Sequence, residues 1–510
     1  MTASQGVFAS SELRDLAPYL LASLPFLWAF YAVFLHPLAG VPGPRLAKVT
    51  RGWHTYKCFK GQWHQVILDL HEKYGPVVRI APDEVSFVDA TALKKLFGHG
   101  SNSAPKTKWY NTWQLSGQGE SVFATQNAQM HAKLRRKLAS TYSMTAILQV
   151  ESLVQEVADE NWAAFERIAG ESRVIDLDFW TGAFSYDVVS ELGMGGRLGF
   201  VKSATDVNGL IRAVTDGFYT ITNMGHVPGQ MLLFDNPITS SLLKLFGARN
   251  AFEDFIKWLD ERVRCRQDGT EPAKRHDMLE SFRTPKGDDE QVTHPEVMVE
   301  AINLLGAGAD TTSIGIRAVL GHLLEYPESY KAVQEEIDGY FAVVGDLEAP
   351  SKLSFKECQK LPKLQNVIRE AQRLHPSIVY QLPRLSPGVE IAGHFIPPGY
   401  AVSISSLSAN RDKAVFGSDA NSFRPSRWED EDEAKRMDSM LCTFGAGNRS
   451  CLGKNLALVE INIYVAQLLR QYDLESAVEQ GQPKWKNYSQ WFNMQTDFLV
   501  RLRRRSNGST

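Results

Sequence analysis

One uninterrupted stretch of helical sequence constrains the fold of this chain more than any other feature. It begins at Thr293-His294-Pro295-Glu296, the pattern of a capping box with proline in the first turn. No helix breaker follows until Tyr326-Pro327, so the stretch predicts a helix of about 30 residues and about 45 Å. We expect a helix of that length to run through the core.

The centre of this helix is unusual for a core helix. Where leucine would be usual, the chain has the small and polar run Gly306-Ala307-Gly308-Ala309-Asp310-Thr311-Thr312-Ser313. Each of its two glycines costs about 1 kcal/mol relative to alanine. Two explanations stay open: a bulky group lies against this face, or the helix packs closely against another helix.

The rest of the chain predicts a mainly α fold with small β sheets. Helical periodicity dominates residues 130 to 375. Short β segments at 77–80 and 85–88 flank the turn signal Pro82-Asp83, and segments at 389–391 and 401–404 repeat that hairpin pattern. Neither an internal repeat nor a composition break divides the body, so we expect one catalytic domain over residues 46–510.

The amino-terminal segment, residues 1–36, has the composition of a membrane anchor. Residues 16–35 carry no charge, and 20 residues span about 30 Å as a helix. The preceding residues are not basic, which favours an anchor over a cleaved signal peptide, although Pro18 and Pro25 weaken the helix. A Pro/Gly-rich hinge follows at 37–45. Basic residues after the span predict a cytoplasmic body: Arg45, Lys48, Arg51, Lys57 and Lys60.

Charge and cysteine content exclude several classes of protein. The chain of 510 residues has 55 Lys+Arg against 58 Asp+Glu and a net charge of -3, which argues against nucleic acid as a partner. Its five cysteines are scattered, with no C-x-x-C pair, so neither a disulfide framework nor a zinc ribbon is expected.

One cysteine lies in a setting that suits metal ligation. The loop Phe444-Gly445-Ala446-Gly447-Asn448-Arg449-Ser450-Cys451-Leu452-Gly453-Lys454 has three glycines in nine residues, which let the backbone approach a flat ligand closely. Apolar residues then recur with helical spacing, so Cys451 is predicted at a helix start, where the helix dipole favours a thiolate. Such a thiolate suits axial ligation of heme iron.

Four motifs together are similar to those of the cytochrome P-450 family of heme-thiolate monooxygenases, most closely its filamentous-fungal microsomal members. The loop resembles the family's heme signature, and Ala307-Gly308-x-Asp310-Thr311-Thr312 resembles its oxygen-activation motif. Glu370-x-x-Arg373 resembles its Glu-x-x-Arg motif, and Arg427 stands in the Pro-x-Arg segment. The resemblance implies the cytochrome P-450 fold with a single transmembrane helix at the amino terminus.

The resemblance also implies roles for individual residues. Cys451 would be the axial ligand of the iron of heme b, and the other expected heme contacts are Phe444, Gly445, Arg449, Arg135, His131 and Arg384. His131 stands where many members of the family have Trp. Asp310 and Thr311 would relay protons, the alternative for Thr311 being a hydroxyl bonded back to the preceding helical turn. Glu370, Arg373 and Arg427 would form a buried structural cluster.

The implied activity is insertion of one atom of O2 into a small apolar organic substrate, in fungal secondary metabolism. The chain has no dinucleotide-binding fingerprint, so electrons would come from NADPH through cytochrome P-450 reductase at the endoplasmic reticulum membrane, with cytochrome b5 as a further donor. Lys133, Arg136, Lys137 and Lys454 would face the reductase. Two alternatives stay open: a heme-thiolate isomerase or dehydratase, which would have little need of Asp310-Thr311, and a non-catalytic heme sensor.

Overall fold

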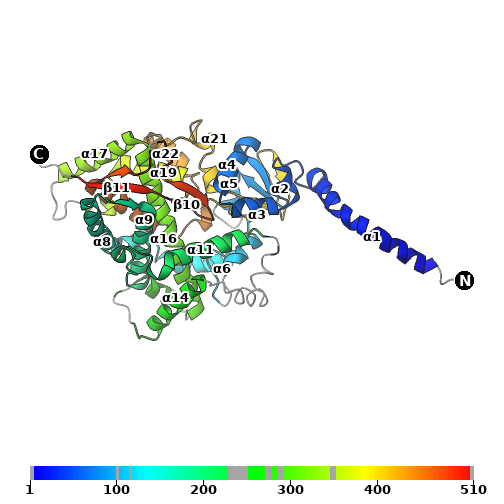
Figure 1. Cartoon of the computed structure of the whole chain (residues 1–510), viewed down its shortest axis with the longest axis horizontal. Coiled ribbons are helices and arrows are strands. Elements are labelled where there is room, and N and C mark those ends of the chain that lie inside the picture. The colour runs from blue at the N-terminus through cyan, green and yellow to red at the C-terminus, as the bar shows by residue number, and fades with distance from the viewer. Residues whose placement is uncertain are drawn as a thin grey trace.

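The computed structural model describes residues 5–98, 103–114, 118–227, 229, 251–271, 275, 277–284, 292–344, 352–479 and 481–505. Helices make up most of this structure, as the sequence predicts (Figure 1). The α-helices are α1 (Gln5–Phe30), α2 (Arg45–Val49), α3 (Gly52–Phe59), α4 (Trp63–Tyr74), α5 (Ala90–Phe97), α6 (Ala128–Ala139), α7 (Met144–Gln149), α8 (Glu151–Gly170), α9 (Leu177–Met194), α10 (Phe200–Ser203), α11 (Leu210–Met224), α14 (Ala251–Gln267), α15 (Met278–Arg283), α16 (His294–Glu325), α17 (Pro327–Val344), α18 (Phe355–Cys358), α19 (Pro362–Leu374), α20 (Ser406–Ala409), α21 (Lys413–Phe416), α22 (Glu431–Asp438) and α23 (Lys454–Gln471). Short 3-10 helices are η2 (Lys108–Trp113), η3 (Val207–Gly209), η4 (Pro425–Trp428) and η5 (Gly447–Arg449).

Within the described residues, the strands form four small sheets. They are β1 (Val77–Ala81), β2 (Glu84–Phe87), β3 (Val174–Asp176), β4 (Arg384–Leu385), β5 (Val389–Ile391), β6 (His394–Ile396), β7 (Ala401–Ser403), β8 (Tyr472–Ser476), β9 (Lys486–Ser489), β10 (Asn493–Thr496) and β11 (Leu499–Arg504). The largest sheet has the order β1-β2-β7-β4, and the others are β3-β11-β8, β9-β10 and β5-β6.

One of the two expected hairpins is correct and the other is wrong. Strands β1 and β2 pair antiparallel around Pro82-Asp83, as expected. The segment at 389–391 pairs instead with β6, because Ala392 and Gly393 both have positive φ and close a tight two-residue turn. Strand β7 is thereby left to join β2 in parallel and β4 antiparallel.

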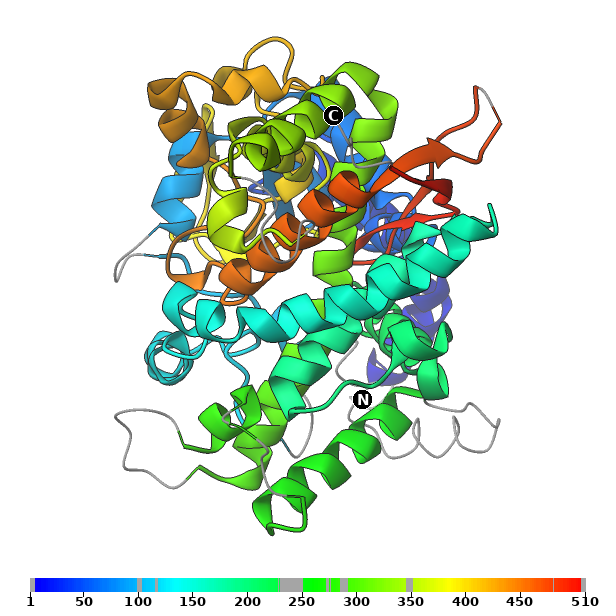
Figure 2. The same ribbon diagram turned by 90° about the vertical axis from the view of Figure 1, so that its left-hand side faces the viewer.

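Helix α16 is the long core helix that the sequence predicts. It spans 32 residues from His294 to Glu325, and Thr293 and Glu296 form the expected capping box. Most of its side chains are buried. In both views it runs through the middle of the body (Figures 1 and 2), where it packs against α9, α14, α19 and α23.

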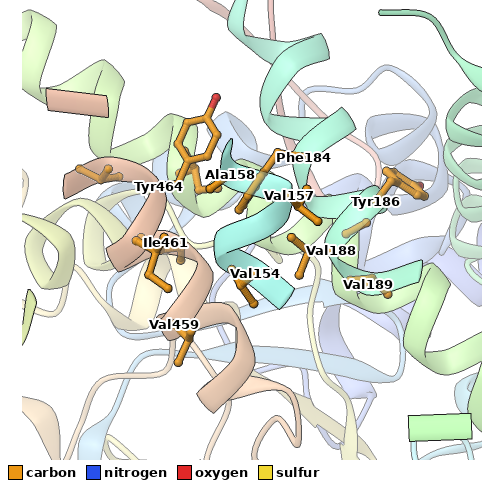
Figure 3. Close-up of a cluster of buried hydrophobic side chains, with 14 of the residues drawn as sticks. Val154, Val157, Ala158, Phe184, Tyr186, Val188, Val189, Val459, Ile461 and Tyr464 are labelled. Atoms are coloured by element: carbon orange, nitrogen blue, oxygen red, sulfur yellow. The ribbon is translucent and has the colours of Figure 1, made fainter. Parts of the chain in front are cut away.

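The largest apolar core joins α8, α9 and α23. Val157, Phe184 and Ile461 come from these three helices and are at most 1% exposed, and Figure 3 shows them close together. Full burial stabilises each such side chain by about 1.5–3 kcal/mol. This packing holds α23 rigidly, and α23 begins three residues after Cys451.

The amino-terminal helix projects away from the body (Figure 1). Helix α1 continues through Pro18 and Pro25 into the π-helix η1 (Tyr31–Leu35). Within the described residues, 17–35 form the one helix long and apolar enough to cross a membrane, with mean hydropathy 1.6 and 6% of its residues buried. The Pro/Gly-rich segment that follows packs against β1: the Arg79 guanidinium donates to the carbonyl groups of Ala32 and Leu38.

Candidate active site

The loop before α23 wraps tightly around Cys451. The backbone N–H of Cys451 donates to the carbonyl of Phe444 at 2.8 Å, which closes the loop. Gly445 and Gly447 have φ of 72° and 62°, a conformation that favours glycine. A Cβ on Gly447 would lie 1.8 Å from the carbonyl oxygen of Phe97, so only glycine lets the loop pass over the end of α5.

The thiol of Cys451 lies at the amino-terminal end of α23. The backbone N–H groups of Gly453 and Lys454 donate to it, as the predicted helix start requires. These N–H groups act to lower the pKa of the thiol, in the direction expected at a helix start. Burial raises the pKa of Cys451, and the opposing influence of these N–H groups and of Arg135 does not compensate for it.

The environment of this thiol is unusual because it is both accessible and desolvated. Cys451 is exposed, yet burial is the largest influence on the pKa of its thiol. Cys451 is therefore accessible although protein atoms surround its thiol closely. The other described cysteines differ: Cys442, for example, is buried, and burial raises its pKa to about 12, as for a thiol packed in the core.

The middle of α16 is also partly accessible, although most of this helix is buried. Ala307 is exposed and Thr311, one turn later, is half-buried, while Gly306, Ala309 and Asp310 are buried. The hydroxyl of Thr311 donates to the carbonyl of Ala307 at 2.8 Å, which is the back-bonded arrangement that the sequence left open.

The two glycines of this segment serve helix packing. A Cβ on Gly308 would lie 3.1 Å from Val189 on α9, and one on Gly306 would lie 3.1 Å from Phe218 on α11. Close packing is therefore the explanation that holds for these glycines, and the accessible surface belongs to Ala307 and Thr311.

Asp310 points to the α9 side of α16. Its carboxyl is buried near Tyr186 and Arg317, and among the described residues Oδ2 has no hydrogen-bond partner. Burial raises the pKa of Asp310 to about 7, against the opposing influence of Arg317 and the Tyr186 hydroxyl. No hydrogen bond joins Asp310 to Thr311 in the part of the chain that the structure describes.

Positive side chains gather beside the Cys451 loop, and we call Lys106, Arg135, Arg384 and Arg449 the cation cluster. Arg135 donates to the carbonyl of Ser450 at 2.7 Å, Arg449 to the carbonyl of Thr125 at 3.1 Å, and Arg384 to the hydroxyl of Tyr110 at 2.6 Å. Among the described residues, none of the four forms an ion pair with a carboxylate.

The members of the cation cluster repel one another. Burial and the nearby charge of Arg384 lower the pKa of Arg449 to about 10. Burial and the nearby charges of Arg449, Lys106, Arg135 and Arg384 lower the pKa of His131 to about 3. His131 is thus buried beside the cluster as a neutral ring.

Sequence reasoning missed two residues here, Lys106 and Tyr110. An isolated β-bridge pairs Lys106 with Arg384, and the Lys106 ammonium lies 4.4 Å from the centre of the Tyr110 ring. Burial lowers the pKa of Lys106 well below its usual value, as do Arg384 and Arg449. No short motif surrounds either residue, and only this bridge between distant segments brings them to the site.

These residues fit a heme group. Heme combines an iron that accepts a thiolate with two anionic propionates. The accessible thiol of Cys451 supplies the first requirement. The cation cluster supplies the second. Lys106 and Arg384 are buried and Arg135 and Arg449 are half-buried, and no carboxylate among the described residues pairs with them. Such charges are costly unless an anion joins them.

A second buried cluster lies behind the same loop, and we call Glu370, Arg373 and Arg427 the paired cluster. Their side chains are 0%, 0% and 2% exposed. Arg373 donates to both carboxylate oxygens of Glu370 at 2.8 Å, and Arg427 donates to one of them at 2.8 Å.

The paired cluster also ties down the chain between β7 and the Cys451 loop. Arg373 donates to the carbonyl groups of Asn410 and Ala420, and Arg427 donates to that of Phe416. Burial acts to raise the pKa of Glu370, but the hydrogen bonds and charges of Arg373 and Arg427 outweigh it and lower the pKa. The carboxylate therefore stays ionised.

Comparison with known proteins identifies the family. The sequence profile of the cytochrome P-450 family matches residues 42–497. A pisatin demethylase of Fusarium vanettenii is 30% identical over 485 residues, which cover 94% of this chain and 92% of the relative. The cytochrome P-450 monooxygenase gsfF of Penicillium aethiopicum is 32% identical over 490 residues, which cover 93% and 95%.

A solved structure has the same fold. The crystal structure of the cytochrome P-450DA heme domain superimposes with a TM-score of 0.75 at 18% identity, covering 92% of this chain and 98% of that chain. The fold, the family profile and the relatives agree with the geometry of the loop and the clusters around it. The chain therefore belongs to the cytochrome P-450 family, as a heme-dependent monooxygenase.

Proposed function

We propose that the enzyme inserts one atom of O2 into a small apolar organic substrate in fungal secondary metabolism, with Cys451 as the axial ligand of heme b. The observation that carries the proposal is that Cys451 is accessible and lies beside a cation cluster that has no carboxylate partner among the described residues. When bound, the heme activates O2 for transfer to the substrate. The relatives, which are fungal monooxygenases and a pisatin demethylase, support the class of reaction.

The residues of the cation cluster would hold the propionates. Arg135 and Arg449 already donate to backbone carbonyls next to the loop and keep further N–H donors for an anion. Arg384 and Lys106, which a β-bridge joins, would add two further positive charges to the cluster. His131 is a neutral hydrogen-bonding group in this role, and Phe444 and Gly445 would contact the flat face of the heme.

Asp310 and Thr311 would hold and transfer protons at the middle of α16. A carboxyl with a pKa of about 7 can both release and take up a proton near neutral pH, which suits a relay. Its carboxyl lies on the α9 side and the Thr311 hydroxyl on the accessible side. A rotation of either side chain or a bridging water would connect them.

Electrons would reach the heme from NADPH through cytochrome P-450 reductase, and cytochrome b5 would be a further donor. Lys133, Arg136 and Lys454 are exposed on α6 and at the start of α23, beside the Cys451 loop. A basic surface at this place would attract an acidic partner and bring it close to the heme. Lys137 lies half-buried on the same helix.

A membrane anchor would place the enzyme beside its reductase. We propose that residues 1–36 form the anchor, 37–45 the connection and 46–510 the catalytic domain, on the cytoplasmic face of the endoplasmic reticulum. The apolar helix over 17–35 and the cations that follow it support this arrangement.

The test is the absorption spectrum of the reduced protein with and without carbon monoxide, for wild type and Cys451→Ser. The wild type should show a strongly red-shifted Soret band that the variant lacks, because a serine hydroxyl does not supply the thiolate. Cys442→Ser is the matched control and should keep the band. A wild type without heme, or with a band that Cys451→Ser leaves unchanged, contradicts the proposal.

A further inference from the structure

A second group of metal-ligating side chains lies outside the site described above. The side chains of His54, Cys58 and His226 each place one ligand atom within 4.8 Å of the other two. Their residues are 0%, 0% and 3% exposed. His54 and Cys58 are one turn apart on α3, so both project from the same face of that helix.

The histidines of this group are buried without hydrogen-bond partners. Among the described residues, neither ring nitrogen of His54 or of His226 has one. A buried polar group without a partner costs about 1–3 kcal/mol, so four such nitrogens in one place indicate that something outside the chain satisfies them. Burial lowers the pKa of His54 well below 6.5 and that of His226 to about 3, so both rings are neutral and keep a lone pair for a ligand.

Hydrogen bonds from several elements hold the residues of this group in place. The Thr55 hydroxyl donates to the carbonyl of His226 at 2.7 Å, which fixes the chain after α11 against α3. The Tyr380 hydroxyl donates to Asn223 Oδ1 at 2.9 Å and lies 3.3 Å from the carbonyl of Cys58.

Aromatic rings surround the histidines. The Trp63 ring lies 4.2 Å from that of His54, and the rings of Tyr380 and Trp109 lie 5.4 and 5.9 Å from that of His226. This shell keeps bulk water away from the three ligand atoms.

We propose that His54, Cys58 and His226 bind one thiophilic metal ion, as two neutral imidazoles and one thiolate. Sulfur and imidazole nitrogen are the ligands that Cu(I) and Zn²⁺ prefer. Binding forms one metal–sulfur and two metal–nitrogen bonds and releases the thiol proton of Cys58 to solvent. Bonds of about 2.0–2.3 Å require the three ligand atoms to move slightly closer together.

Charge balance favours copper over zinc. Cu(I) with one thiolate and two neutral imidazoles has no net charge, whereas Zn²⁺ leaves one positive charge in a buried site. An uncompensated buried charge is strongly unfavourable. Arg51, a charged side chain that acts on both histidines, is positive, and Asp83 and Glu84 already pair with it. The bound ion would link α3 to the chain that follows α11.

The experiment measures metal bound to the full-length, heme-loaded protein. The protein is incubated with Cu(I) under reductant, or with Zn²⁺, in the presence of a competing chelator, and the metal is then counted against heme iron by mass spectrometry. We expect about one equivalent of added metal per heme. X-ray absorption of the added metal should show one sulfur ligand and two nitrogen ligands.

Two variants and two matched controls test the ligands. Cys58→Ser and His226→Asn should each lower the affinity for the metal at least about tenfold, since each removes a ligand. Cys358→Ser and His64→Asn change another buried thiol and another buried histidine with unpartnered nitrogens, and they should keep wild-type binding. The carbon monoxide spectrum checks that every variant is folded.

The outcomes separate the possibilities. Retention of Cu(I) by the wild type and its loss in the two ligand variants supports the proposal with copper, and the same pattern with Zn²⁺ alone supports it with zinc. The proposal is overturned if the wild type retains neither ion, or if the ligand variants bind as much metal as the controls.

Discussion

The two groups of charges near the Cys451 loop differ in whether the described chain itself neutralises them. In the paired cluster, Glu370 accepts hydrogen bonds from Arg373, Arg427, Trp428 and the backbone of Arg424. In the cation cluster, nearby positive charges help to lower the pKa values of Lys106 and Arg449. The oxygen Oδ2 of Asp310 likewise has no partner among the described residues.

This difference separates structural charges from functional ones. Charges that find partners within the chain fix the backbone that carries them. Unpaired charges are retained at a cost in stability, and such groups concentrate where a ligand or a reaction uses them. Four substitutions test this distinction, in order of decreasing effect.

The largest effect is expected from Glu370→Gln. The substitution leaves Arg373 and Arg427 buried without a carboxylate, and breaking a buried ion pair costs roughly 3–5 kcal/mol. We expect little heme-loaded protein and an unfolding free energy lower by that amount, measured by denaturant titration. The exposed ion pair of Glu433 with Arg436 provides the control Glu433→Gln, which should change stability by less than about 1 kcal/mol. Equal effects in both variants would remove the distinction.

Asp310→Asn should lower product formation roughly 100-fold, since general acid–base catalysis contributes at least about that factor. With a pKa of about 7, the wild-type carboxyl loses its proton as the pH rises. We therefore expect wild-type turnover to fall above about pH 7 and the variant to lack that fall. The measurement is product formed with reductase and NADPH between pH 6 and 8.5, and a variant with the wild-type pH profile would contradict the relay.

The contribution of Asp310 to stability should change with pH in the opposite direction to that of Glu370. The folded-state pKa of Asp310 lies above that of an unfolded aspartate, about 3.9. Between about pH 4 and 7 the unfolded chain therefore binds fewer protons at this residue, and its contribution to stability falls as the pH rises. Asp310→Asn removes this loss, so denaturant titration at pH 8 should find the variant at least as stable as wild type.

Arg449→Gln should weaken heme retention about tenfold, because a hydrogen bond to a charged group contributes about 1.5–3 kcal/mol. The unfolding free energy should change little, since the removed charge has no carboxylate partner among the described residues. Transfer of heme to apomyoglobin measures retention, and Arg436→Gln is the exposed control. Unchanged heme transfer with a large loss of stability would make Arg449 a structural residue.

The smallest effect is expected from Thr311→Ala, about a fivefold fall in product formed per NADPH consumed, which corresponds to loss of one hydrogen bond of about 1 kcal/mol. Thr312→Ala is a close control, because the Thr312 hydroxyl also bonds back to the preceding turn but is buried. Full coupling in Thr311→Ala would leave only the structural role for this hydroxyl.

Local sequence signals predicted much of the fold and part of the site. The capping box at Thr293 predicted the start of α16 because a cap depends on a few neighbouring residues. Glycines 445 and 447 predicted the close turn before Cys451, since their φ values are local properties. The spacing of Glu370 and Arg373 placed them one turn apart, but their burial depended on chain about 50 residues further on.

The sequence by itself determined the long helix α16, the hairpin of β1 and β2, the Cys451 loop and the family resemblance, because each depends on residues that are near one another in the chain. Only the tertiary structure decided what distant segments bring together: the pairing of β7 with β2, the bridge between Lys106 and Arg384, and the contact of His226 with α3. It also decided the pKa directions of Cys451 and Asp310. Burial is the largest influence on both values, and burial depends on the packing of the whole chain around a side chain.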